Sequence, residues 1–211
     1  MSTTATPIAD QVALVQRNTA GRAPAAVAPA MPSGIAAVGT AMPDGALLDV
    51  YGQPTILDKV RNGKPAVIVF YRGAWCPYCN LTLRTYQQTL ALELDARGVA
   101  LIAISPQKPD GSLSMQEKHA LTYAVLSDPG NQIAGPLGIL TAPSEDARQT
   151  QVAHGLDLTA INADGTTAIP MPTVVIVDGA GTIRWIDVHP NYTTRTEPGQ
   201  ILDALATTIG Q

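Results

Sequence analysis

Both cysteines of this chain lie close together, in the run Trp75-Cys76-Pro77-Tyr78-Cys79. The run follows an apolar stretch typical of a β-strand, residues 66–71, and precedes a helical pattern. A thiol at the start of a helix faces unpaired backbone N–H groups and the positive end of the helix dipole, and both favour the ionised sulfur. Pro77 suits the first helical position, where its missing N–H costs nothing. We therefore predict a redox-active pair in which Cys76 attacks a substrate and Cys79 closes a disulfide with it.

Three other roles for the two cysteines compete with redox chemistry. A structural disulfide that closes so short a loop would stabilise the fold by only about 2 kcal/mol. A structural zinc ion needs four ligands, whereas the chain has no second cysteine pair and no histidine at a ligand spacing. Inert cysteines of the core are a third possibility, but that role does not explain why both thiols lie at a strand-to-helix junction. Redox chemistry explains the position of the pair best, and we predict no metal site.

Cationic and aromatic neighbours of the pair are candidates for supporting roles. Arg72, at the end of the predicted strand, could supply positive charge to a thiolate or to a peroxide oxygen, or could simply be solvated there. Trp75 is expected to shield the sulfur, with ordinary packing as the alternative. Further arginines that could reach the site are Arg84, Arg148 and Arg195.

The elements around the pair predict an α/β unit. Residues 66–71 form a continuous apolar run, as expected for a strand buried on both faces. A helical pattern over 77–97 ends at Arg97-Gly98, and a second apolar run covers 99–105. Such a strand, helix and strand form a right-handed parallel unit. The cysteines then lie at the carboxyl end of a central strand, where open α/β sheets bind their ligands.

The rest of the chain completes one domain with an N-terminal arm. We predict an arm over residues 1–34, with a short helix and an Ala/Pro-rich linker, and a globular domain over residues 35–211. Strands at 173–177 and 182–188 form a hairpin, and a last helix begins near Pro198. Residues 141–169 read as a long excursion with a helix near its start, and such segments are usually functional or lie at an interface.

Composition limits the classes of function. The 211 residues are 45% hydrophobic with a single Phe, which predicts a core of aliphatic residues and alanine. A formal net charge of −4 without a basic stripe argues against a nucleic-acid partner. No apolar stretch is long enough to span a bilayer, and no secretory signal is evident at the N-terminus. Two cysteines in a redox arrangement, with none for stapling, predict a cytoplasmic protein.

The order of these features resembles the peroxiredoxin superfamily, in particular the alkyl hydroperoxide reductase/thiol-specific antioxidant (AhpC/TSA) group. The specific match is the segment Phe-Tyr-Arg-Gly-x-Trp-Cys-Pro-Tyr-Cys-Asn, here residues 70–80. The likeness covers roughly residues 36–209 and includes Pro190-Asn191-Tyr192-Thr193-Thr194-Arg195. The Cys-Pro-Tyr-Cys core is also the glutaredoxin motif.

The resemblance implies a thioredoxin fold, with a central mixed sheet flanked by helices, and a thiol-dependent peroxidase. Cys76 would reduce a hydroperoxide and become a sulfenic acid, and Cys79 would condense with it to a disulfide. Thioredoxin or a glutathione-linked donor such as glutaredoxin would reduce that disulfide. No bound cofactor is implied, and a homodimer is compatible with the family.

Two features of the site bear on this expectation. In a thioredoxin-type fold the proline before the third central strand faces the cysteines and is usually cis, so we predict a cis bond at Pro172. Typical peroxiredoxins carry Pro-x-x-x-Thr-x-x-Cys; counted back from Cys76, Val69 and Gly73 occupy the Pro and Thr positions.

Two alternatives stay open. One is a thiol–disulfide oxidoreductase without peroxidase turnover, because the residues that polarise a peroxide would be missing. The other is a non-enzymatic redox sensor or binding protein that uses residues 141–169 or the N-terminal arm to dock a partner.

Overall fold

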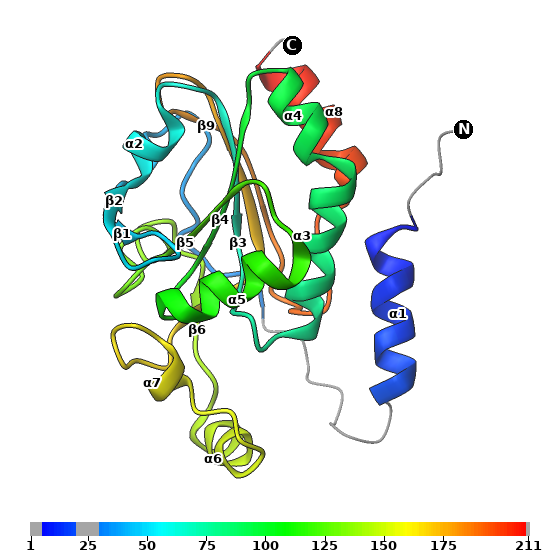
Figure 1. The fold of residues 1–211 in the computed structure, drawn as a ribbon, viewed down its shortest axis with the longest axis vertical. Coiled ribbons are helices and arrows are strands. Elements are labelled where there is room, and N and C mark those ends of the chain that lie inside the picture. The colour runs from blue at the N-terminus through cyan, green and yellow to red at the C-terminus, as the bar shows by residue number, and fades with distance from the viewer. Residues whose placement is uncertain (1–5, 20–29, 210–211) are drawn as a thin grey trace.

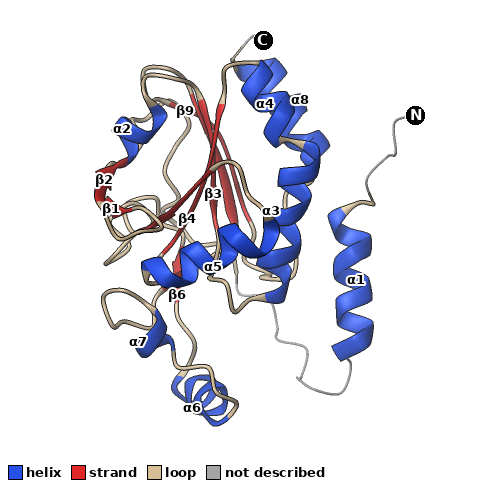
Figure 2. Cartoon of the chain, in the orientation of Figure 1, coloured by secondary structure: helices blue, strands red, loops and turns tan. Residues whose placement is uncertain are grey.

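The fold is built on a central mixed β-sheet with helices on both faces (Figures 1 and 2). A computed structural model describes residues 6–19 and 30–209. Within these residues the main sheet has seven strands in the order β2-β1-β5-β4-β3-β8-β9. This arrangement confirms the predicted α/β class with its central mixed sheet.

The middle of the sheet consists of the strands that the sequence predicted to be buried. Strand β3 (Ala66–Phe70) pairs in parallel with β4 (Ala100–Ser105), which pairs in parallel with β5 (Ala124–Ser127). On its other side β3 pairs antiparallel with β8 (Thr173–Val177), which forms the predicted hairpin with β9 (Ile183–Val188). Every residue of β3 and β8 is buried, because layers of side chains cover both faces of the sheet.

Successive side chains of β3 point to opposite faces of the sheet, so they pack alternately into two layers of the core. Val67 and Val69 pack with one layer, which contains residues of α3 (Pro77–Thr89), α4 (Ala91–Ala96), α5 (Pro109–His119) and α8 (Pro198–Thr208). Ile68 and Phe70 pack with the other, which contains a residue of α2 (Leu57–Arg61) and residues of the segment 133–139. Strands β1 (Ala46–Leu48) and β2 (Pro54–Ile56) complete one edge of the sheet.

The predicted helix over 77–97 is two helices. The break lies at Leu90, which ends α3 and begins α4, with a φ angle of −111°. Leu90 is buried together with Leu83 and Leu94, so the apolar stripe that predicted one helix continues across the break. The predicted burial of these leucines is therefore confirmed, although the backbone bends between the two helices.

The excursion between β5 and β8 carries elements of its own. It contains a two-stranded sheet of β6 (Leu140–Thr141) and β7 (Ile169–Pro170), with α6 (Glu145–Ala153) and α7 (Leu158–Ile161) between them. Helix α6 begins where predicted, because the Ser144 side chain accepts a hydrogen bond from the N–H of Ala147 at 3.3 Å. In Figure 1 α6 and α7 lie at the lower end of the molecule, away from the sheet's other helices.

The N-terminal helix α1 (Ile8–Thr19) lies along α3 (Figure 1). Its Ile8 and Val12 are buried in the same layer as α3, as the predicted apolar face requires. The carboxylate of Glu197 accepts hydrogen bonds from the N–H groups of Ile8 and Ala9, at 2.9 and 2.8 Å. The predicted linker near residues 23–32 lies mostly outside the described residues.

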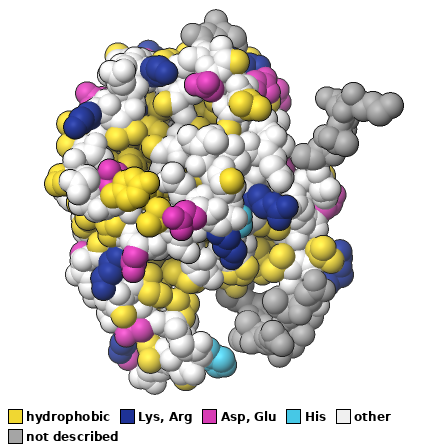
Figure 3. Space-filling model, in the orientation of Figure 1, with side chains coloured by type: hydrophobic (Ala, Val, Ile, Leu, Met, Phe, Trp, Pro, Cys, Tyr) yellow, Lys and Arg dark blue, Asp and Glu magenta, His cyan; other side chains and the backbone are white. Residues whose placement is uncertain are grey.

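The face drawn in Figure 3 bears charged side chains of both signs. On the face drawn in Figure 3, Lys and Arg side chains are scattered among acidic and apolar ones and form no basic patch. Within the described ranges, no helix combines the length and the apolar character needed to cross a bilayer.

The contact between Glu197 and α1 gives a first test of the fold. Because Glu197→Ala leaves two N–H groups at the start of α1 without acceptors, we expect it to lower the free energy of unfolding by about 1 kcal/mol. Hydrogen exchange should rise over residues 8–19, and also in the first turn of α8, which Glu197 caps. Glu145→Ala, which removes an exposed glutamate of α6, is the matched control. Unchanged exchange over α1 in Glu197→Ala would show that this contact does not hold the helix.

Candidate active site

The two cysteines occupy the junction that the sequence predicted, and both are free thiols. Cys76 is the N-cap residue of α3, Pro77 is its first residue, and Cys79 lies in its first turn. This junction follows the carboxyl end of β3. Both residues are buried, with exposed fractions of 1% for Cys76 and 0% for Cys79. The site is therefore enclosed, which the sequence did not predict.

The loop between β3 and α3 is held from two sides. The amide of Gln107, which follows β4, accepts a hydrogen bond from the N–H of Ala74 at 2.7 Å and donates one to the hydroxyl of Tyr71 at 3.1 Å. The side chain of Asn80 donates to the carbonyls of Ala74 and Cys76, at 2.7 and 2.9 Å. These bonds fix the backbone that places Cys76 at the helix start.

Gly73 in this loop has a φ angle of +145°, which side chains rarely allow. A Cβ atom at this position would lie 2.5 Å from the indole nitrogen of Trp75. A glycine is thus required for Trp75 to fold back over the loop.

Arg72 lies between two aromatic rings. Its guanidinium carbon is 4.8 Å from the centre of the Trp75 ring and 4.6 Å from that of Tyr192. Such stacking favours the cation and fixes its position. The charge of Arg72 favours ionisation of both sulfurs, so the predicted positive charge beside the pair is present. Trp75 thus contacts the cation beside the pair.

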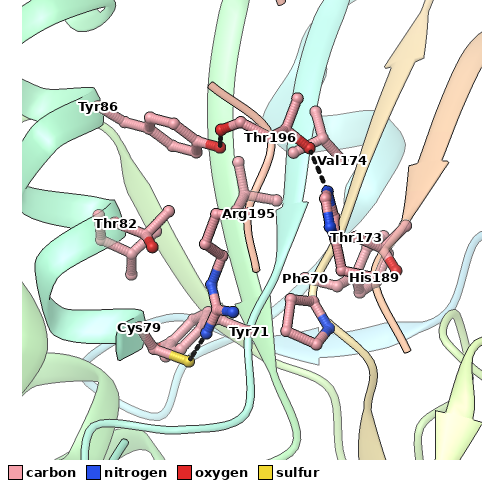
Figure 4. A pocket seen from close by; sticks show the side chains of 13 residues that line it. Phe70, Tyr71, Cys79, Thr82, Tyr86, Thr173, Val174, His189, Arg195 and Thr196 are labelled. Atoms are coloured by element: carbon pink, nitrogen blue, oxygen red, sulfur yellow. Dashed lines mark hydrogen bonds between the residues drawn. The ribbon is translucent and has the colours of Figure 1, made fainter. Parts of the chain in front are cut away.

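A second arginine, Arg195, reaches the sulfur of Cys79 directly. Its Nη2 donates a hydrogen bond to Cys79 Sγ at 3.3 Å (Figure 4). Its Nη1 donates to the carbonyls of Tyr192 and Thr194, at 2.5 and 2.6 Å, which holds the guanidinium in place. Of the three further arginines that the sequence offered, this one therefore belongs to the site.

The other two arginines serve elsewhere. Arg148 forms an ion pair with Glu145 on α6 at 2.7 Å, and Arg84 is exposed on α3. Since all three candidates were simply basic residues in the sequence, nothing local to them could distinguish Arg195.

The negative charge of the pair is best held on Cys79. Burial alone opposes ionisation of Cys79, but a hydrogen bond from Cys76, the charge of Arg195 and the backbone N–H of Arg72 outweigh it and lower its pKa to about 5. The hydrogen bond with Cys79, followed by burial, raises the pKa of Cys76 well above its ordinary value. We predicted the ionised sulfur at Cys76 from the helix start; the structure favours Cys79, whose sulfur accepts hydrogen bonds from the Cys76 thiol and from Arg195.

A small cavity of about 10 Å³ lies beside Cys79, large enough for roughly one water molecule. Arg195 and His189 also line it (Figure 4), and so does Pro172. His189 is held by hydrogen bonds to Asp187 at 2.9 Å and to Thr194 at 2.9 Å. His189 was not among the predicted site residues, because no motif in the sequence around it distinguishes it from the other histidines.

Pro172 lies at the site as predicted, but the predicted cis bond is wrong: no peptide bond among the described residues is cis. The trans form is the intrinsically favoured one for X–Pro. In this arrangement the carbonyl of Pro172 accepts a hydrogen bond from the N–H of His189 at 2.9 Å, which ties the proline to the end of β9.

The described residues also bear on the zinc alternative. Among them, no group of three or more His, Cys, Asp or Glu side chains is arranged to hold a metal ion. The cysteines are instead surrounded by two arginines, which suit an anion.

The contact between Arg195 and Cys79 predicts a change in titration. Because the guanidinium stabilises the thiolate, Arg195→Gln should raise the midpoint of thiolate formation, by about one to three pH units. Absorbance at 240 nm as a function of pH measures this midpoint. Arg184→Gln, which removes an arginine paired with Asp178 at the far end of the β8–β9 hairpin, should leave it unchanged. Equal midpoints in the wild type and Arg195→Gln would mean that this contact does not stabilise the charge.

Comparison with known proteins connects this site to a family. The model of the AhpC/TSA family matches residues 38–186. The chain is 31% identical over 104 residues to "Putative peroxiredoxin bcp" of Haemophilus influenzae, a match that covers 49% of this chain and 66% of that protein. It is 27% identical over 101 residues to the chloroplastic peroxiredoxin Q of Sedum lineare, covering 48% of this chain and 53% of the relative. The matches thus span less than two thirds of these relatives.

A solved structure shows the same fold. The reduced Prx3 of Vibrio vulnificus, in complex with hydrogen peroxide, aligns with a TM-score of 0.65 at 19% identity, covering 81% of this chain and 99% of that one. Together with the match of the family model over most of the globular part, this likeness establishes that the chain is a thioredoxin-fold member of the AhpC/TSA family.

Proposed function

We propose that the protein is a thiol-dependent peroxidase that reduces hydroperoxides through Cys79 and Cys76. The observation that carries this proposal is the Cys79 sulfur, hydrogen-bonded to Arg195 at 3.3 Å and bordering a cavity large enough for roughly one water molecule. A buried thiolate beside a cation has the charge for attack on an O–O bond, and the cation can also stabilise the oxygen that leaves. The family membership supports the same reaction class.

In the first step the Cys79 thiolate attacks the terminal oxygen of the hydroperoxide. The S–O bond forms as the O–O bond breaks, so that the sulfur becomes a sulfenic acid and the other oxygen leaves as hydroxide or alkoxide. A proton then converts that anion to water or an alcohol. Arg195 lies where this negative charge develops.

This assignment exchanges the roles that the sequence suggested for the two sulfurs. The motif Pro-x-x-x-Thr-x-x-Cys can be counted back from Cys79 instead of Cys76. Arg72 then occupies the Pro position and Cys76 the Thr position. The thiol of Cys76 hydrogen-bonds to the Cys79 sulfur, as a threonine hydroxyl at that position would. Both motif positions still differ in this register, but a side chain able to form a hydrogen bond stands at the Thr position.

The second step uses the proximity of Cys76. Its thiol, hydrogen-bonded to Cys79, attacks the sulfenic sulfur; an S–S bond forms, and the hydroxyl leaves as water. A dithiol or a glutathione-linked thiol then reduces the disulfide by exchange. We propose thioredoxin or a glutathione/glutaredoxin system as the donor class.

The burial of both sulfurs argues against a general disulfide reductase as the main activity. With exposed fractions of 1% and 0%, neither sulfur meets a protein disulfide without local opening, whereas a hydroperoxide needs much less space. The Cys-Pro-Tyr-Cys motif can still undergo thiol–disulfide exchange once the start of α3 opens. The reductant of the proposed cycle needs the same opening.

Single cysteine variants test the roles of the two sulfurs. Treated with one equivalent of hydrogen peroxide, Cys76→Ser should form a sulfenic acid at Cys79, because the thiolate is still held by Arg195. Cys79→Ser should react at least tenfold more slowly, since it lacks the sulfur to which Arg195 donates its hydrogen bond. Dimedone trapping with mass spectrometry identifies the modified sulfur, and stopped-flow fluorescence gives the rate. The opposite pattern would return the attack to Cys76.

Turnover distinguishes the enzymatic alternatives. With a thioredoxin system, the wild type should consume hydroperoxide much faster than the Cys76→Ser,Cys79→Ser double variant. Reduction of insulin at a comparable rate, with no peroxide turnover, would favour the thiol–disulfide oxidoreductase.

A further inference from the structure

Arg195 reaches the Cys79 sulfur from the loop between β9 and α8, residues 189–197. A long side chain keeps one position in a site only where the structure around it is itself held. The contacts of Thr194 and Thr196, the two neighbours of Arg195 in the chain, therefore decide where the guanidinium lies.

Thr196 is held through both its side chain and its backbone. Its exposed fraction is 1%. Its hydroxyl donates a hydrogen bond to Oδ2 of Asp187 at 2.8 Å, and its carbonyl accepts one from the hydroxyl of Tyr86 at 2.6 Å (Figure 4). The chain directly after Arg195 is thus tied to β9 on one side and to α3 on the other.

Thr194, on the other side of Arg195, is tied to the same carboxylate through His189. Its hydroxyl is hydrogen-bonded to Nδ1 of His189 at 2.9 Å. Nε2 of His189 donates in turn to Oδ2 of Asp187 at 2.9 Å. One carboxylate oxygen therefore holds Thr196 directly and Thr194 through the imidazole ring.

Asp187 suits this role because it is an ionised acceptor on a rigid element. The hydrogen bond from His189, joined by that from Thr196, outweighs partial burial and lowers the pKa of Asp187. An ionised carboxylate forms stronger hydrogen bonds than a neutral acceptor does. Asp187 lies in β9, where it is paired with Val174 of β8, and the N–H of His189 donates to the carbonyl of Pro172 at 2.9 Å. The loop that carries Arg195 is thus anchored to the central sheet.

The charge of Asp187 has the wrong sign to favour the thiolate by itself. A negative group near a sulfur opposes its ionisation. His189 and Thr196 line the cavity beside Cys79, whereas Asp187 lies behind them and outside its lining. A favourable effect of Asp187 on the thiolate must therefore pass through the cation that it helps to position.

We propose that Asp187, together with His189 and Thr196, positions Arg195 on the Cys79 sulfur, so that the stability of the thiolate depends on this carboxylate. The assignment rests on the proposed function, in which the Cys79 thiolate attacks the hydroperoxide, and it adds positioning residues to that site. Asp187 acts through the loop backbone and the guanidinium.

Titration of the thiolate, followed by absorbance at 240 nm, tests this assignment. Asp187→Ala should raise the midpoint by about one pH unit, because Arg195 loses its fixed position, whereas loss of the negative charge alone would lower it. Asp95→Ala, which removes an exposed aspartate of α4, is the control and should leave the midpoint unchanged. An unchanged or lowered midpoint in Asp187→Ala would overturn the assignment.

A matched pair of substitutions at Thr196 decides the question even if Asp187→Ala does not fold. Thr196→Val keeps the shape of the side chain but removes the hydroxyl that Asp187 binds, so the midpoint should rise by about half a pH unit. Thr196→Ser keeps the hydroxyl and should titrate like the wild type. No shift in Thr196→Val, or the same shift in both variants, would contradict a positioning role for this hydrogen bond.

A double variant shows whether Asp187 acts through Arg195. In an Arg195→Gln background, Asp187→Ala should cause no further rise of the midpoint, because no guanidinium remains to be positioned. Equal rises in both backgrounds, or no shift in Arg195→Gln itself, would reject the assignment. The titration needs no peroxide. Absence of peroxidase turnover with these shifts intact would therefore reject the proposed function and leave the positioning role standing.

Discussion

The buried contact between Arg195 and the Cys79 sulfur is the interaction on which the chemistry of this protein depends. A thiolate excluded from water is unfavourable unless a positive group offsets the loss of hydration. Here the guanidinium of Arg195, the stacked Arg72 and the thiol of Cys76 together provide that compensation. Their balance, rather than the helix start alone, determines which sulfur carries the charge.

The fold supports this contact from segments that are distant in the chain. Arg195 lies in the loop between β9 and α8, which Tyr86 of α3 holds through a hydrogen bond from its hydroxyl to the carbonyl of Thr196 at 2.6 Å. Glu197, in the same loop, binds the start of α1. The N-terminal helix is therefore joined to the loop that carries the arginine, so its packing and the geometry of the site are physically linked.

Both sulfurs are enclosed, which limits the size of what can reach them without local opening. The cavity next to Cys79 admits only a small group. Small, uncharged reactants reach the thiolate more easily than a folded partner does. Reduction of the resulting disulfide requires the start of α3 to open locally. In the proposed cycle the small hydroperoxide therefore reacts in the closed site, and the larger reductant reacts after the site has opened.

The sequence by itself determined the sheet and the place of the cysteines. The apolar run of β3 and the helical pattern after it are local signals, and they fixed Cys76 and Cys79 at the end of a central strand. Tertiary structure decided the choice of Arg195 among several arginines, the position of His189, the trans bond at Pro172 and the sulfur that holds the charge. These features arise from contacts such as that of Arg195 with Cys79, which are 116 residues apart, and no local pattern encodes such a contact.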